Sequence, residues 1–163
     1  MYRTLALLGC MLALAGCATY QPVPQGYTGP TASVRDSGIS EDSTKAQMFA
    51  LMEIDGNRIA NAFGASAIAS QGRGASLTTV YPERSVQIRP MKVVIRGSHA
   101  TGAPIHAMAS QMAGTFFSVE GTVTLTPTAN GKYVVKGELK KDKSSVWIED
   151  SETGQAVTDK VTK

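Results

Sequence analysis

The chain has 163 residues, a formal net charge of +3 and a hydrophobic content of 42%. Its length allows one ordinary domain and excludes large architectures such as a TIM barrel or a two-domain kinase. Charged residues make up only 18% and aromatic residues 6%, while the 16 glycines favour short strands and turns over long helices.

The N-terminus has the arrangement of an export signal. Arg3 supplies a positive charge, an apolar run covers residues 5–14, and small residues stand at Ala15 and Gly16. This order is typical of a secretory signal peptide. The apolar run is also shorter than the roughly 20 residues that a permanent membrane-spanning helix needs. We therefore expect residues 1–16 to be removed on export.

Residues 14–17, Leu-Ala-Gly-Cys, resemble the lipobox of bacterial lipoproteins. The resemblance implies that the Cys17 thiol becomes a diacylglyceryl thioether, that the chain is cut before Cys17, and that the new amine is acylated, as with palmitate. The alternative is an ordinary signal peptide cut elsewhere, with Cys17 as a free or paired thiol. In lipoproteins of diderm bacteria the residue after the cysteine guides sorting. Ala18 at that position implies anchoring in the outer membrane, on its periplasmic face.

This processing accounts for both cysteines. Cys10 leaves with the signal peptide, and Cys17 carries the lipid. The mature chain then has no free thiol and no disulfide, which excludes cysteine catalysis and zinc sites built from thiolates. Of 16 basic residues Arg3 is lost, so 15 against 13 acidic residues leave a net charge of +2. With so few aromatics, this balance argues against nucleic acid as a partner.

Residues 18–44 differ in composition from the rest of the chain. Prolines and glycines alternate over residues 22–38, a polar stretch follows to Thr44, and no helical or strand period is visible. This composition predicts a flexible, disordered tether over residues 17–44. A random coil of that length spans about 30 Å. The folded domain is then expected over residues 45–163.

The first strand is predicted at residues 46–54, an apolar run that ends at Asp55 and Gly56, a pair typical of two-residue hairpin turns. A helix is the alternative, because the apolar residues of this run also fit helical spacing. The returning strand is expected over residues 57–62. Residues 60–76 are rich in Ala, Gly and Ser and predict a loop with one helical turn.

Apolar residues at every second position predict the later strands. They occur over residues 91–97, 117–125 and 133–139, and shorter strands are expected at 146–148 and 156–161. Short strands separated by turn residues predict an all-β fold, either a single small β-sandwich or a partly open barrel. The last strands are expected to follow one another as a meander.

No pattern in the sequence is typical of an enzyme. His99 and His106 are the only histidines, and no third ligand stands at a spacing typical of a metal site. No serine lies in a Gly-x-Ser-x-Gly elbow. The acids Glu149, Asp150 and Glu152 lack calcium-loop spacing and are interpreted as a solvated turn. We therefore expect a non-catalytic protein without a metal or cofactor.

Two features are candidates for binding. Five basic residues stand between positions 73 and 96 against the single acid Glu83. They form either a basic surface for anionic envelope components or an acidic partner, or a set of solvated side chains on exposed strand faces. Trp147, the only tryptophan, is a candidate anchor for a partner or a glycan if it faces outward. The basic residues are Arg73, Arg84, Arg89, Lys92 and Arg96.

Together these features predict an outer-membrane lipoprotein with a non-catalytic β domain that faces the periplasm. Residues 119–150 resemble the ectodomains of small uncharacterised proteobacterial outer-membrane lipoproteins, a resemblance that implies no defined activity. The predicted function is a protein-interaction or envelope-assembly accessory module, with the membrane bound through Cys17 and an envelope protein as partner. The alternative is a glycan- or lipid-binding module that uses Trp147 and the basic stretch over residues 73–96.

Overall fold

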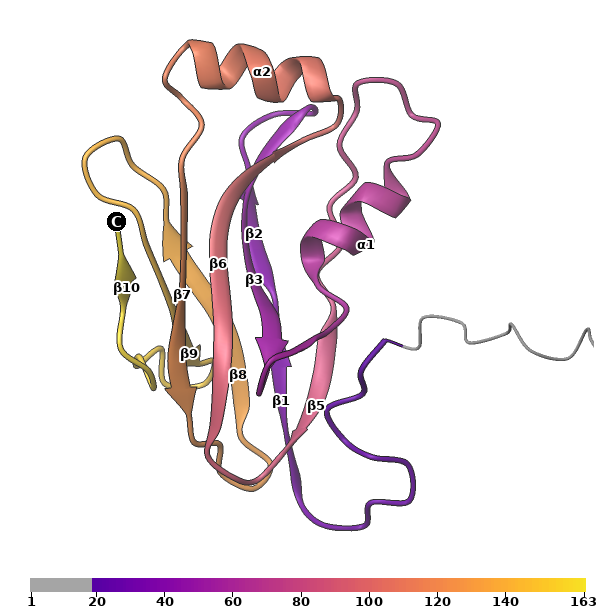
Figure 1. Ribbon diagram of the computed structural model, residues 1–163, viewed down its shortest axis with the longest axis vertical. Coiled ribbons are helices and arrows are strands. Elements are labelled where there is room, and N and C mark those ends of the chain that lie inside the picture. The colour runs from indigo at the N-terminus through magenta and orange to yellow at the C-terminus, as the bar shows by residue number, and fades with distance from the viewer. Residues whose placement is uncertain (1–18) are drawn as a thin grey trace, which may run out of the picture.

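Two β-sheets pack face to face in the computed structural model, which describes residues 19–163 (Figure 1). The first sheet has the strand order β10-β9-β8-β1-β5, and the second has the order β2-β3-β6-β7 with β4 paired to β3. The predicted all-β sandwich is therefore confirmed. The first sheet consists of β1 (Thr31–Arg35), β5 (Glu83–Gln87), β8 (Lys132–Glu138), β9 (Ser145–Asp150) and β10 (Val161–Thr162). The second consists of β2 (Ser37–Ser40), β3 (Lys45–Ile54), β4 (Asn57–Arg58), β6 (Met91–Thr101) and β7 (Ser118–Leu125), and the helices are α1 (Ala62–Ala69) and α2 (Pro104–Met112).

The main core lies between the two sheets and follows the period of two that the sequence predicts. Met91, Val93 and Ile95 of β6 are buried, whereas Lys92 between them is exposed. Such alternation places every second side chain of a strand in the core. The other strands contribute in the same way, with Phe49, Leu51, Leu125, Val135 and Ile148 among the buried residues.

β3 is buried on both faces, which explains why its sequence fits a helix as well as a strand. Phe49 and Leu51 point into the main core, whereas Met48 and the alanines beside it form a second, smaller core with α1. A strand with two buried faces has a continuous apolar run instead of an alternating one. The predicted strand is confirmed, and so is the hairpin turn after it, where Asp55 and Gly56 both have positive φ.

The predicted tether is wrong for residues 31–40, which form β1 and β2. The chain passes through β1 in the first sheet, bends at Asp36 and continues as β2 in the second sheet. Ala32 and Val34 are buried, so the period of two is present but is hidden by small residues among prolines and glycines. Tyr20 also packs against the main core. The folded domain therefore begins well before the predicted boundary.

The two helices lie outside the sheets. α1 packs on β3, and its N-cap residue Asn61 accepts hydrogen bonds from the amides of Phe63 (3.1 Å) and Gly64 (3.2 Å). α1 replaces the single helical turn that was expected here, and the returning strand predicted over residues 57–62 is reduced to β4. α2 has no counterpart among the predicted elements, and it lies across one end of the sandwich (Figure 1).

The C-terminal meander is confirmed, because β8, β9 and β10 are consecutive neighbours in the first sheet. The edge strand predicted over residues 156–161 is shorter and later than expected: only Val161–Thr162 pair with β9, and Ala156 makes a single bridge to Glu149. Val161 lies directly over Gly121 of β7, where a β-carbon would approach it to 2.6 Å. β10 thus brings the two sheets together along this side.

Candidate functional site

Cys17, the predicted site of lipidation, lies outside the described residues, so its modification stays a prediction. The described chain begins two residues later, at the exposed Thr19. Within residues 19–163, no helix combines the length and apolar character needed to cross a bilayer.

Arg84, one of the predicted basic residues, belongs to a buried ion pair. Its Nη1 donates to Oδ1 of Asp36 at 2.8 Å, and the two side chains are 10% and 0% exposed. The same carboxylate accepts the amide protons of Leu51 (3.0 Å) and Ala62 (2.8 Å). If β2 continued its pairing with β3, Arg35 would face Leu51, but Arg35 belongs to β1 of the other sheet. The Asp36 carboxylate supplies the acceptor that the Leu51 amide would otherwise lack. Because Arg84 holds this carboxylate in place, the ion pair stabilises the bend between the two sheets.

Arg89 is also occupied by an acid of the chain. Its Nη2 donates to Oδ2 of Asp55 at 2.7 Å, and the amide of Lys92 donates to the other carboxylate oxygen at 2.9 Å. The hydrogen bond from Arg89, aided by the Lys92 amide, holds the pKa of the Asp55 carboxyl below its ordinary value, although partial burial opposes the shift. This group stabilises the hairpin turn after β3.

Of the other two predicted arginines, Arg96 lies on the outer side of the second sheet and Arg73 lies in a loop. The Arg96 guanidinium is 5.3 Å from the centroid of the Phe63 ring of α1 and 3.8 Å from Glu120 of β7. Arg73 is exposed in the loop that follows α1. The structure therefore does not bring the four predicted arginines together, and they form no continuous basic surface.

Trp147 lies on the outer face of β9, in the first sheet, and is half-buried. Its indole N–H donates to Oε2 of Glu149 at 3.2 Å, and the Lys160 ammonium lies 4.1 Å from its ring centroid. Neighbouring side chains thus occupy both the polar atom and one face of the ring. Because Arg96 lies on the opposite outer face of the sandwich, the binding site predicted from Trp147 and the basic stretch is not assembled.

His99 is buried near the β2–β3 turn, and both of its ring nitrogens have partners. Nδ1 accepts the amide proton of Phe117 at 3.0 Å, which leaves Nε2 to donate to Oε1 of Glu41 at 2.9 Å. Burial raises the pKa of this carboxyl, but hydrogen bonds from Gln47, Lys45 and the imidazole outweigh burial and hold the pKa below its ordinary value. His99 therefore joins the turn to the start of β7.

His106 lies on α2, and its buried Nδ1 has no hydrogen-bond partner within residues 19–163. In the same part of the chain, no three His, Cys, Asp or Glu side chains come together in a way that suits a metal ion. The acids after β9 form a turn. Asp150 accepts the amide protons of Thr153 and Glu152 at 2.9 Å each, and these hydrogen bonds hold the pKa of Asp150 below its ordinary value.

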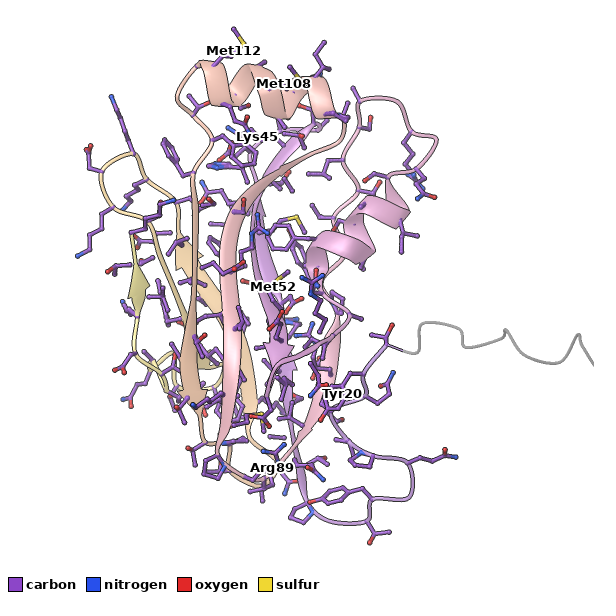
Figure 2. The ribbon with its side chains drawn as sticks, viewed as in Figure 1. Tyr20, Lys45, Met52, Arg89, Met108 and Met112 are labelled. Carbon is purple, nitrogen blue, oxygen red and sulfur yellow. The ribbon has the colours of Figure 1, made fainter. Side chains whose placement is uncertain are left out.

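An apolar stripe on α2 has no counterpart among the predicted sites. Ile105, Met108 and Met112 are 69%, 62% and 89% exposed. They stand at positions i, i+3 and i+7, which share one side of a helix. α2 contains no Asp, Glu, Lys or Arg, and none of its residues is fully buried. We call these three side chains the α2 stripe; Figure 2 shows Met108 and Met112 at the end of the molecule.

Local sequence places α2 at this end with little packing beneath it. Pro104 occupies the first turn, where its missing N–H is harmless. Ala103 at the N-cap has no side-chain acceptor, and Gly114 with φ of +65° follows the C-terminus of the helix. A cavity of about 470 Å³ lies between Ala107 of α2 and residues of α1, β6 and the loop after α1. α2 thus extends over a hollow and presents its apolar residues outward.

A lysine-rich loop lies beside the segment that follows α2. Lys140, Lys141 and Lys143 are exposed in the β8–β9 loop, and we call these three residues the lysine loop. Part of this loop lines a shallow pocket of about 230 Å³ together with Phe116 and Phe117, the residues just before β7. Figure 1 shows the loop and α2 at the same end of the sandwich. Lys140 is paired with Glu138 at 2.7 Å, and Asp142 stands in the same loop. The segment that follows α2 therefore has a loop of net positive charge beside it.

The sequence does contain a signal for this site. Ile105, Met108, Ala109 and Met112 stand at i, i+3, i+4 and i+7, the spacing of one helical face. The helix has only nine residues, whereas helical periodicity is distinct over windows of about 11 or more. The stripe therefore becomes visible only in the structure, where no side chain of residues 19–163 covers it.

Comparison of the chain with protein-family models, with curated proteins and with solved structures gives no match.

Proposed function

We propose that this protein is an outer-membrane lipoprotein that binds an envelope protein through the α2 stripe and has no catalytic activity or cofactor. The exposure of Ile105, Met108 and Met112 on an uncharged helix carries this proposal. Moving a side chain of this size from water to an apolar surface contributes about 1.5–3 kcal/mol. A partner that covers the stripe gains the larger part of this contribution from each of the three side chains, which are already partly covered, before the opposing cost of association.

The chemistry of the stripe indicates what kind of partner fits it. Anchors at i, i+3 and i+7 are typical of a helix that docks into a hydrophobic groove of another protein. Methionine adapts its shape to such grooves because its side chain is unbranched and polarizable. The neighbouring lysine loop favours acidic residues at the rim of the groove, since opposite charges orient the encounter of two proteins. The proposed partner is therefore a protein with an apolar groove and an acidic rim.

The membrane part of the proposal rests on the sequence. Residues 14–17 have the form of a lipobox, and Cys17 stands two residues before the first described residue, Thr19. A diacylated or triacylated cysteine gives stable anchoring, because each buried methylene contributes about 0.8 kcal/mol. The α2 stripe then belongs to a domain that stays at the membrane and recruits its partner there.

A glycan- or lipid-binding site that uses Trp147 is not proposed. It would need Trp147 and the basic stretch on one surface, whereas the indole is occupied by Glu149 and Lys160 and the arginines lie elsewhere.

Site-specific photo-cross-linking in living cells tests the proposal. A photo-reactive residue replaces Met108 in one strain and Val157, which is 40% exposed between β9 and β10, in a matched control strain. We expect one defined protein adduct from position 108 that position 157 does not give. The partner is then purified, and its Kd is measured for the wild-type protein and for the variants Met108→Asp and Val157→Asp.

A charge placed in an apolar groove removes the contribution of a central anchor, so Met108→Asp is expected to weaken binding at least about tenfold. Val157→Asp is expected to leave the Kd unchanged. The proposal is contradicted if position 108 gives the same adducts as position 157, or if both Asp variants bind the partner as the wild type does.

A further inference from the structure

A groove lies where the described chain begins. Thr19 and Tyr20 form one side of it, and α1 with the residues before it forms the other, enclosing about 670 Å³. None of the described residues that line the groove is acidic, and Arg58, whose side chain is 91% exposed, is the one charged residue among them. Ile68 of α1 stands at its edge with 69% exposure. The groove thus combines an apolar side chain, an exposed cation and the first residues of the described chain.

Very few residues connect Cys17 to this groove. Tyr20 packs against the main core, so the domain holds the chain from this residue onward. Only three residue steps separate Tyr20 from Cys17. A fully extended chain covers at most about 3.6 Å per residue, so the anchor lies within about 11 Å of Tyr20. A tether of about 30 Å would leave the domain free to turn, but this short connection does not.

We infer that the groove and the exposed side of α1 lie directly against the phospholipid surface that holds the lipid of Cys17. The inference rests on the proposed function, because it takes the lipid anchor as given. The length of chain outside the described residues then decides which face meets the membrane: only residues near Thr19 can reach it.

The residues of this face suit a phospholipid surface. α1 has no charged residue and presents Ile68 outward, so it loses no charge hydration at the interface. The Arg58 guanidinium contacts Glu53 only at 3.5 Å and stays in water, where it can meet lipid phosphates. Since the anchor keeps the face close to the lipid, weak contacts are sufficient to hold it there.

This orientation leaves the α2 stripe free for a partner. Figure 2 shows Met108 and Met112 at one end of the long axis, whereas Tyr20 lies on the side of the molecule. With the side near Tyr20 on the membrane, the end of the sandwich that carries Met108 and Met112 is not the face that meets the lipid, and the α2 stripe remains in water.

Fluorescence quenching by labelled lipid tests the inference on the full, processed chain. The protein is produced with Ile68→Cys or, as a matched control on the exposed side of α2, Met112→Cys. A fluorescent label is attached to the new thiol. Each protein is reconstituted into vesicles of phosphatidylethanolamine and phosphatidylglycerol that carry a nitroxide on the headgroups. Intact-mass measurement of the same samples establishes whether Cys17 carries its lipid.

We expect the label at position 68 to be quenched several-fold more strongly than the label at position 112. A third protein carries twelve inserted Gly and Ser residues between Ala18 and Thr19. Lengthening the connection from three residues to about fifteen lowers the effective concentration of the face at the membrane about tenfold. Quenching at position 68 is therefore expected to fall toward that at position 112.

Equal quenching at the two positions on a chain that carries its lipid overturns the inference and leaves the proposed anchor intact. Strong quenching at position 68 that the insertion does not reduce also overturns it, because the short connection would then not be the cause. An unmodified Cys17 overturns the proposed anchor and the inference together.

Discussion

Replacement of Asp36 by alanine is expected to remove a large part of the stability of the domain. The variant leaves the Arg84 guanidinium, 10% exposed, without its carboxylate at 2.8 Å. It also leaves the amides of Leu51 and Ala62 without their acceptors. Breaking a buried ion pair by removing one partner costs about 3–5 kcal/mol. We therefore expect the free energy of unfolding to fall by about 4 kcal/mol, against a total of about 5–15 kcal/mol for a typical domain.

Urea unfolding followed by the fluorescence of Trp147, the one tryptophan of the chain, measures this loss. With a slope of about 2 kcal/mol per molar urea, a loss of 4 kcal/mol lowers the midpoint by about 2 M. Asp142→Ala in the exposed β8–β9 loop is the matched control and is expected to change stability by less than about 0.5 kcal/mol. The milder variant Asp36→Asn keeps one acceptor oxygen, enough for one of the two amides, and gives an intermediate loss if Asp36→Ala does not fold.

A double variant separates the unpaired charge from the lost amide bonds. Asp36→Ala combined with Arg84→Met removes the buried cation as well, so the pair should lose less stability than the sum of the two single variants, with a coupling of about 1–3 kcal/mol. The explanation of the bend between the sheets is refuted if Asp36→Ala unfolds at the same urea concentration as Asp142→Ala.

Three further predictions concern packing, pH and the α2 stripe. A β-carbon at Gly137 would lie 2.5 Å from the ring of Phe49, so Gly137→Ala should lower the free energy of unfolding by about 1–3 kcal/mol. Gly64→Ala is the control: Gly64 has open space around it in α1, so this variant should raise the free energy of unfolding by less than about 1 kcal/mol. Equal urea midpoints for the two variants would contradict the packing of Gly137 against Phe49. Because Arg89 holds the pKa of Asp55 below its ordinary 3.8, their pairing stabilises the folded state above that pH and is lost as the pH falls through the lower folded-state pKa. Acid titration of unfolding should therefore show a smaller loss of stability for Asp55→Asn than for the wild type, and an identical pH profile would count against the pairing. Met112→Ser should leave the melting temperature almost unchanged, with less than about 0.5 kcal/mol of effect, because this side chain is 89% exposed; a large drop in melting temperature would show that the domain itself buries the stripe.

The strands with one buried and one exposed face could be predicted from the sequence. β7 alternates along its whole length and β6 over its first seven residues, and both strands lie where the alternation indicates. β8 also lies at the predicted place, although three consecutive residues of it are buried. β3 is a harder case because both of its faces are buried, so its apolar run fits a helix equally well. The Asp55-Gly56 turn decides between the two, since it is specific to a hairpin.

β1 could not be predicted because its partners are distant in sequence. β2 pairs with the neighbouring β3, but it has only four residues and none of them is buried, so it has no apolar period. β1 pairs with β5 and β8, so Thr31 faces Gln87 and Ser33 faces Lys132. Small residues such as Ala32 form a core position here only because larger side chains of other strands surround them. Local composition therefore indicates a tether where tertiary pairing produces a strand.

The predicted site residues could not be assessed from local sequence for the same reason, because their partners are distant in the chain. A count of charges treats Arg84 as part of a basic stretch, but its acid Asp36 stands 48 residues earlier, and only the fold brings the two together. Trp147 fails as an open anchor because Lys160, on the segment before β10, lies over its ring. The helical spacing of the α2 stripe can be read from the sequence, but the exposure of its three side chains depends on the tertiary structure.

The mass of the N-terminal fragment of the protein, purified from membranes, tests the central claim most directly. A lipid-anchored protein must begin at Cys17, with a diacylglyceryl group on the sulfur and a fatty acyl group on the amine. A chain that begins at another residue, with a free thiol at Cys17 or without that cysteine, would contradict the anchor and the membrane orientation that rests on it.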